Sequence, residues 1–161
     1  MTDAKISILL VDDKKFMRDS IKQYILSNPV KKIGTVEYEF DITEVDNGEE
    51  SILQYTSHNN VFEIVIMDLS MGKGINGLEA SKQILEIDPN ARIIGMASEG
   101  DRYVEEFKNC GIKFFLEKPF QSTYINSKID SMIKEILLEK PVEELSLKKK
   151  KKSLMQKLMS K

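Results

Sequence analysis

The stretch ISILLVDD, residues 6–13, is a nearly continuous apolar run that ends in two adjacent acids. The apolar part is too short for a helix and does not alternate with polar residues, which is typical of a strand buried on both faces of a parallel sheet. The same pattern returns at residues 64–67 (IVIM), which Asp68 follows directly. Two buried strands, each followed by an acid, therefore indicate a parallel sheet and place a candidate functional site at the ends of these strands.

Amphipathic stretches separate the apolar runs. Helical spacing of apolar residues predicts helices at 14–27, 49–57, 78–87, 101–110 and 122–138, and we expect strands at 6–11, 36–45, 64–67, 92–97 and 113–117. Residues 29–35 are expected to form a loop or a hairpin insertion. Strands that alternate with helices fold into a mostly parallel sheet covered on both faces, so we predict a doubly wound α/β domain with five parallel strands.

The length of 161 residues allows one domain and an appendage, which we assign to residues 1–140 and 141–161. No run of about 18 apolar residues is present, and the first residues do not resemble a secretory signal. The single cysteine, Cys110, excludes an internal disulfide, and together with one histidine it cannot form a structural zinc site. We therefore expect a cytoplasmic protein.

The charge of the chain is unevenly distributed. Residues 141–161 carry a net charge of +5, mostly from Lys148 to Lys152, whereas the rest of the chain carries -7. The lysine run is followed by apolar residues at helical spacing, namely Leu154, Met155, Leu158 and Met159. This basic segment fits a disordered solubilising tail, a contact with an anionic membrane or a partner, or a cover over the acidic body. Specific DNA binding is not expected, because no aromatic residues are interleaved with the lysines.

Charged residues gather where the predicted strands end. Asp12 and Asp13 follow the first strand, Asp68 follows the third, and Lys118 follows the fifth. In a doubly wound sheet the carboxyl ends of the strands form the functional edge, so these side chains are expected to converge. Three adjacent carboxylates repel one another unless a cation lies between them, and Mg²⁺ suits oxygen ligands while leaving positions for phosphate oxygens. The pattern predicts Mg²⁺-assisted phosphoryl transfer to a carboxylate.

The segments that carry these residues resemble response-regulator receiver domains of two-component signalling, of the chemotaxis-regulator kind. The matching elements are ILLVDD (8–13), IVIMDLSM (64–71), the Asn76-Gly77 turn and FFLEKPF (114–120). The resemblance implies a flavodoxin-like sheet with strand order 2-1-3-4-5. It also implies a signalling protein rather than an enzyme, in which a histidine kinase or phosphotransfer protein phosphorylates the chain and so switches its binding of a downstream protein.

The resemblance also implies a role for each site residue. Asp68 would be the phosphoacceptor, Asp13 a direct Mg²⁺ ligand, and Asp12 a ligand acting partly through water. The backbone carbonyl of Ser70 would complete the protein's ligand set. Lys118 would contact the phosphoryl group, and Pro119, which often follows a cis bond in this family, would hold the lysine's loop.

The chain departs from the family pattern at the switch positions. Ala97 stands where a threonine or serine usually bonds the phosphoryl group, and Ser98 could replace that hydroxyl if the strand were shifted by one residue. Phe115, at the aromatic switch position, lacks a hydroxyl. The loop at 72–77 has a glycine where proline is common and is one residue longer, so we expect it to be less constrained.

Two other functions remain open from the sequence. Because of Ala97, the chain could be a binding module of the same fold that works without phosphorylation. An aspartyl phosphatase is the third possibility, but such enzymes use an acid two residues after the nucleophile, where this chain has Ser70.

Overall fold

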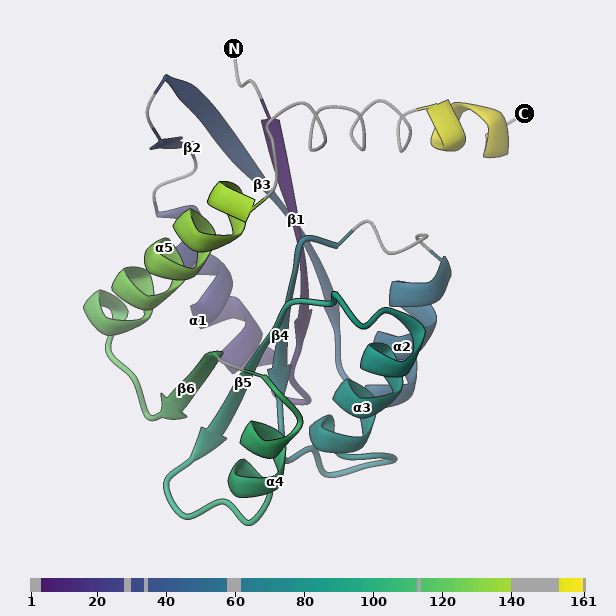
Figure 1. Ribbon diagram of the computed structural model, residues 1–161, viewed down its shortest axis with the longest axis vertical. Helices are drawn as coiled ribbons and strands as arrows, with labels where there is room; N and C mark the ends of the chain where they lie inside the picture. The colour runs from purple at the N-terminus through teal and green to yellow at the C-terminus, as the bar shows by residue number, and fades with distance from the viewer. Residues whose placement is uncertain are drawn as a thin grey trace.

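The computed structural model describes residues 4–27, 30–33, 35–57, 62–112, 114–139 and 154–160. One twisted sheet forms the centre of the molecule, and helices cover both of its faces (Figure 1). The strands, in spatial order, are β2 (Val30–Ile33), β3 (Val36–Val45), β1 (Ala4–Val11), β4 (Ile64–Asp68), β5 (Ile93–Ser98) and β6 (Phe114–Lys118).

Five of these strands are parallel and confirm the predicted sheet. β1 lies between β3 and β4, and β5 and β6 follow in order. The sixth strand, β2, lies in the region expected to be a loop or hairpin insertion. It pairs antiparallel with β3, from Val30 opposite Glu39 to Ile33 opposite Val36. The hairpin alternative was therefore correct, and it adds one edge strand to the predicted sheet.

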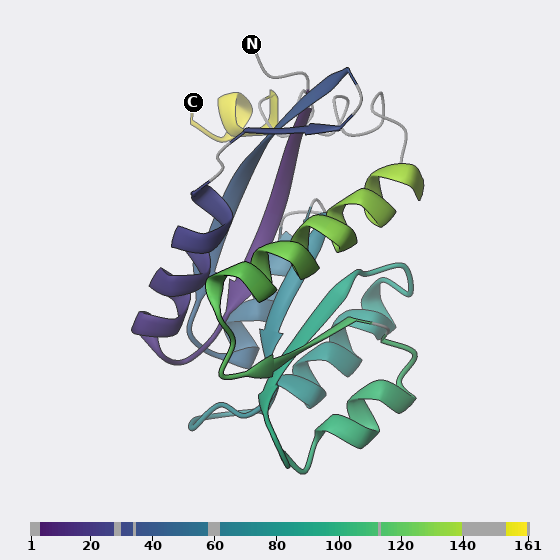
Figure 2. The same ribbon diagram turned by 90° about the vertical axis from the view of Figure 1, so that its left-hand side faces the viewer.

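The helices are α1 (Lys15–Leu26), α2 (Gly48–Ser57), α3 (Gly77–Ile87), α4 (Val104–Asn109) and α5 (Ser122–Glu139). Helices α1 and α5 cover one face of the sheet, and α2, α3 and α4 cover the other (Figures 1 and 2). The alternation of side chains along each strand divides the core in the same way. Ile66 and Met96 pack with α1 and α5, whereas Met67 and Ala97 pack with the opposite layer.

Helix α4 is shorter than the predicted helix at 101–110. The carboxylate of Asp101 accepts the N–H of Tyr103, and the carbonyl of Asp101 accepts the N–H of Val104. Asp101 therefore begins a turn that precedes the helix, as aspartate often does, and regular helix begins only at Val104.

In the basic segment, the structure describes residues 154–160, of which 154–159 are helical. The predicted domain boundary at 140/141 and the lysine run lie outside the described residues. Within the described ranges, no helix combines the length and apolar character needed to cross a bilayer.

Candidate functional site

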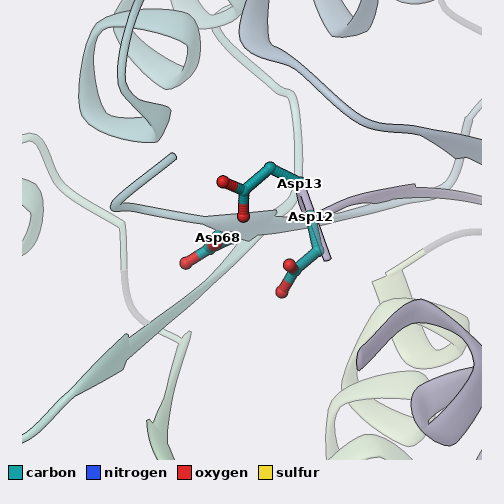
Figure 3. Close-up of side chains that lie close together, drawn as sticks. All are labelled: Asp12, Asp13 and Asp68. Atoms are coloured by element: carbon teal, nitrogen blue, oxygen red, sulfur yellow. The ribbon is translucent and has the colours of Figure 1, made fainter. Parts of the chain in front are cut away.

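Three carboxylates meet at the carboxyl edge of the sheet. Asp12 and Asp13 follow β1, and Asp68 is the last residue of the neighbouring strand β4. Because Val11 is paired with Met67 in the register of these strands, the residues that follow them reach the edge together. Figure 3 shows the three side chains grouped there. The predicted convergence is therefore present in the structure, and Lys118 joins it from the end of β6.

Asp68 is buried at the centre of this group. Its side chain is only 3% exposed, and its Oδ1 lies 3.2 Å from Nζ of Lys118. Its other oxygen, Oδ2, is buried and has no hydrogen-bond partner among the described residues. Burial and the adjacent Asp12 raise the pKa of Asp68 to about 6, although Lys118 opposes them. The site thus holds a carboxylate with one oxygen left unsatisfied.

Asp12 is fully buried and orders the surrounding backbone. Its Oδ2 lies 3.1 Å from Nζ of Lys118, so the lysine bridges Asp12 and Asp68. Its Oδ1 accepts the N–H of Lys14 at 2.8 Å, and its backbone carbonyl accepts a bond from Nη1 of Arg18 at 2.7 Å. Three contacts, with Lys118, Lys14 and Arg18, therefore hold Asp12 in place.

Asp13 is the most accessible of the three acids. Although partial burial raises the pKa of its carboxyl group, the N–H of Gly72, at 2.9 Å from Oδ2, and the Lys14 ammonium together lower it below its ordinary value. Asp13 also lines an open pocket of about 590 Å³, which Glu49 and Lys73 border from the other side. This carboxylate is thus ionised and reachable from solvent.

The acidic group fits a hard divalent cation. One carboxylate oxygen from each of Asp12, Asp13 and Asp68 lies within 4.8 Å of the others. Oxygen atoms are the ligands that Mg²⁺ prefers, and a cation would satisfy the orphaned Oδ2 of Asp68. Asp13 faces the open pocket, where water molecules can complete the coordination.

The start of α3 packs directly against the backbone of Asp68. A Cβ atom on Gly77 would lie 1.9 Å from the carbonyl oxygen of Asp68, which is far inside van der Waals contact. The N–H of Gly77 donates to the carbonyl of Leu69 at 2.8 Å. Only glycine allows this approach, which explains Gly77 in the Asn76-Gly77 turn.

The two residues at the end of β5 face opposite sides of the sheet. Ala97 is buried in the layer that contains Phe107, and Met96 packs on the other side with α1 and α5. Ser98 follows by alternation on the side of Met96 and is exposed, paired in register with Lys118. Lys118 and Asp68 share this side, because Leu116 and Ile66 each precede them by two residues and pack there. Of Ala97 and Ser98, only Ser98 is exposed and carries a hydroxyl.

The other predicted residues surround this edge. Phe115 is half-buried beside Phe107, with ring centroids 6.5 Å apart. The Lys118–Pro119 bond is cis, as the resemblance implied. The hydroxyl of the exposed Ser70 donates a hydrogen bond to Oδ2 of Asp101. This bond joins the loop after β4 to the loop after β5.

Sequence reasoning missed the residues that hold the loop after β4. Gly72 bonds Asp13, and Oε1 of Glu49 accepts the N–H of Ile75 at 2.9 Å. Each carboxylate comes from a different part of the chain, so no local pattern reveals the contact. The loop that was expected to be less constrained is thus anchored at two points.

The fold and the site together define a class: a doubly wound α/β protein with three grouped carboxylates and a lysine at the carboxyl edge of its sheet. Residues 8–130 match the family described as the response regulator receiver domain, and the chain belongs to that family. It is 34% identical over 128 residues to the chemotaxis protein CheY of Thermotoga maritima, covering 79% of this chain and 97% of the relative. Against CheY of Bacillus subtilis the identity is 32%, with 78% and 96% covered.

A solved structure supports the same assignment. The fold is similar to a chain in the crystal structure of the CheX-CheY-BeF3-Mg+2 complex from Borrelia burgdorferi, with a TM-score of 0.66 and 27% sequence identity. The match covers 80% of this chain and 89% of that one. The predicted family and strand order are confirmed.

Proposed function

We propose that Asp68 accepts a phosphoryl group from the phosphohistidine of a histidine kinase or phosphotransfer protein. The observation that carries this proposal is the orphaned Oδ2 of Asp68, which is buried at the edge of the sheet while Oδ1 is held by Lys118. Such a chain is a cytoplasmic signalling switch rather than an enzyme with turnover, although its own residues assist the gain and loss of the phosphoryl group.

In this reaction a carboxylate oxygen of Asp68 attacks the phosphorus atom. The new O–P bond forms as the N–P bond to the donor imidazole breaks, and the imidazole leaves with the electron pair and takes up a proton. Mg²⁺, when bound, neutralises charge on the phosphoryl oxygens. Lys118 contributes a second positive charge, and its bridge to Asp12 keeps the ammonium group beside the reacting carboxylate.

We assign the Mg²⁺ ligands to Asp13, Asp68 and the backbone carbonyl of Ser70, with Asp12 acting partly through water. The close grouping of the three carboxylates supports this set. Hydrolysis by an aspartyl phosphatase is less well supported. Its general acid would stand at Ser70, whose hydroxyl instead donates to Asp101.

The output is proposed to be a protein-binding surface formed by α4, β6 and α5. Phe115 lies on β6 against Phe107 of α4, so repacking of this aromatic pair would change the surface that a downstream protein reads. CheX and CheY are the proteins named in the solved complex. For the present chain we propose only that the target is a protein.

We assign the phosphoryl-binding hydroxyl to Ser98 rather than to position 97. Ser98 extends on the same side of the sheet as Asp68 and Lys118, whereas Ala97 is buried on the opposite side against the layer of Phe107. Ala97 offers no hydroxyl, whereas the exposed Ser98 is paired in register with Lys118, which would contact the same phosphoryl group. The departure from the family pattern then shifts the switch residue without removing it.

Intact mass spectrometry tests the acceptor. The full chain is incubated with acetyl phosphate or phosphoramidate in the presence of Mg²⁺, and one phosphoryl adduct per chain is expected. Asp68→Asn should lose the adduct, because the amide is a poor nucleophile, whereas Asp46→Asn should retain it. Persistent one-to-one labelling of Asp68→Asn would refute the proposal.

A second experiment tests Ser98. Ser98→Ala should slow labelling by about tenfold or more, in line with the loss of one hydrogen bond to a developing charge. Ser98→Thr should keep most of the rate. Unchanged labelling rates in both variants would show that the Ser98 hydroxyl does not contact the phosphoryl group.

The alternative function, a binding module that does not depend on phosphorylation, is favoured only by the alanine at 97. Partner binding with and without beryllofluoride and Mg²⁺ separates the two functions. Equal affinities would support the module, and a change of about fivefold or more would support the switch.

A further inference from the structure

The end of the sequence contains a basic and apolar segment that plays no part in phosphoryl transfer. Seven lysines fall within residues 148–161, and no acid lies among them. Residues 154–159 form a short helix. Its large apolar side chains remain exposed: Leu154 59%, Met155 45%, Leu158 63% and Met159 81%.

The apolar and polar residues of this segment lie on different sides of the helix. At about 100° per residue, the leucines and methionines occupy one arc of about 140°. Ser153, Gln156, Lys157, Ser160 and Lys161 would occupy the other side if the helical spacing continued at both ends. A helix with one apolar side and lysines on the other is suited to the boundary between water and an apolar layer.

The lysine run favours a layer of anionic lipid headgroups over a groove on a folded protein. Five consecutive lysines at 148–152 cannot all face one side of a helix or strand, so a groove on a folded protein could contact only some of them. A fluid layer of anionic headgroups attracts every lysine within its potential, whatever the direction of the side chain. The run also contains no arginine, the residue best suited to fixed bidentate contacts with a protein carboxylate.

We propose that residues 148–161 bind the anionic surface of a lipid bilayer. The lysines are held by the headgroup charge, and Leu154, Leu158 and Met159 enter the headgroup boundary. The remainder of the chain, residues 1–147, carries -9 and is repelled by the same surface. The segment therefore tethers the receiver domain near a membrane without covering its acidic edge, and this role does not depend on whether Asp68 is phosphorylated.

The basic segment could instead bind the acidic part of its own chain, residues 1–140, which carries -7. Its charge is also complementary to the lysines, but Leu154, Leu158 and Met159 each keep more than half of their surface exposed. An intramolecular cover would bury them. The lipid surface accounts for the apolar side chains as well as for the charge.

Flotation of the full chain with lipid vesicles tests the proposal. We expect binding to phosphatidylcholine vesicles in which about a third of the lipid is phosphatidylserine, and little binding to phosphatidylcholine alone. Replacing all five lysines at 148–152 by glutamine should weaken binding at least about a hundredfold, since each lysine contributes roughly fivefold. Leu158→Gln should weaken it by about tenfold. Raising sodium chloride from about 0.1 M to about 0.5 M should release the protein.

Three further variants identify which property of the segment causes the binding. Replacing the same five lysines by arginine should preserve binding, because the charge is kept. Lys128→Gln with Lys134→Gln removes two exposed charges from α5 and should leave binding unchanged, whereas Lys148→Gln with Lys149→Gln should weaken it.

Three results would overturn the proposal: no binding to the anionic vesicles, equal binding by the five-glutamine variant, or NMR shifts showing that the segment docks on the acidic body in the presence of vesicles.

Discussion

The surroundings of Asp68 disfavour the ionised form of its carboxyl group. Burial and the neighbouring Asp12 raise the pKa of Asp68 to about 6, although Lys118 partly compensates. An acid whose pKa is higher in the folded than in the unfolded protein weakens folding once it is ionised. The effect is absent below the unfolded pKa of about 3.8, grows between about pH 4 and pH 6, and is complete above that range.

We therefore predict that Asp68→Asn stabilises the metal-free protein. Above about pH 7 the gain in the free energy of unfolding should be about 1–3 kcal/mol. Below about pH 3.5 it should fall close to zero, because the carboxyl group of Asp68 is then mostly neutral in both the folded and the unfolded protein. Urea unfolding in EDTA over this pH range measures the difference. Glu135→Gln, on the exposed side of α5, should stay within about 0.5 kcal/mol of wild type. A less stable Asp68→Asn at pH 8 would show that the attraction of Lys118 outweighs burial and Asp12.

At the scale of elements, the contact between α3 and β4 holds the acceptor in place. Gly77 at the start of α3 lies against the Asp68 carbonyl with no room for a Cβ atom. Gly77→Ala must push the helix or the strand aside, so we predict a loss of about 3 kcal/mol in stability and a slower labelling of Asp68. Gly111→Ala is the matched control, since its Cβ meets nothing within 4 Å and only the positive φ of 84° opposes it. Similar losses in both variants, measured by urea unfolding, would contradict the steric explanation.

The elements of this fold were largely predictable because their patterns are local. The apolar runs that end at Val11 and Met67 predicted strands with nearly the observed bounds, and their parallel order followed from the alternation with helices. Strand β2 lies in a segment for which the sequence allows a loop or a hairpin, because its four residues include two lysines and depend on pairing with β3. The side of the sheet that Ser98 faces was not predictable, since it depends on the register of β5 against its neighbours.

The same distinction separates the parts of the site. The carboxylates at the strand ends could be predicted, because the topology of a parallel sheet brings those ends together. The contacts of Asp13 with Gly72 and of Ser70 with Asp101 could not, since they join loops whose paths are set by tertiary packing. Sequence patterns thus locate the reacting groups, and only the structure shows how the loops around them are connected.

For the whole molecule, the acidic edge links cation binding to global stability. Asp12 and Asp13 follow β1, Asp68 ends β4, and Lys118 ends β6, so unfolding separates the three strand ends that carry them. A cation that binds only the assembled group stabilises the folded state in proportion to its occupancy. Bound Mg²⁺ would also relieve the repulsion between Asp12 and Asp68, two carboxylates buried side by side.

We therefore predict that saturating Mg²⁺ raises the melting temperature by about 5–10 °C relative to EDTA at equal ionic strength. Asp13→Asn should lose most of this increase, because it removes the ionised acid that faces the open pocket. Asp19→Asn removes an acid that pairs with Lys15 on the exposed side of α1, and it should keep the full increase. Differential scanning calorimetry measures the three shifts, and comparing shifts rather than absolute temperatures cancels any effect of the substitutions on the metal-free fold. An equal shift in Asp13→Asn and wild type would mean that the cation binds elsewhere on the chain.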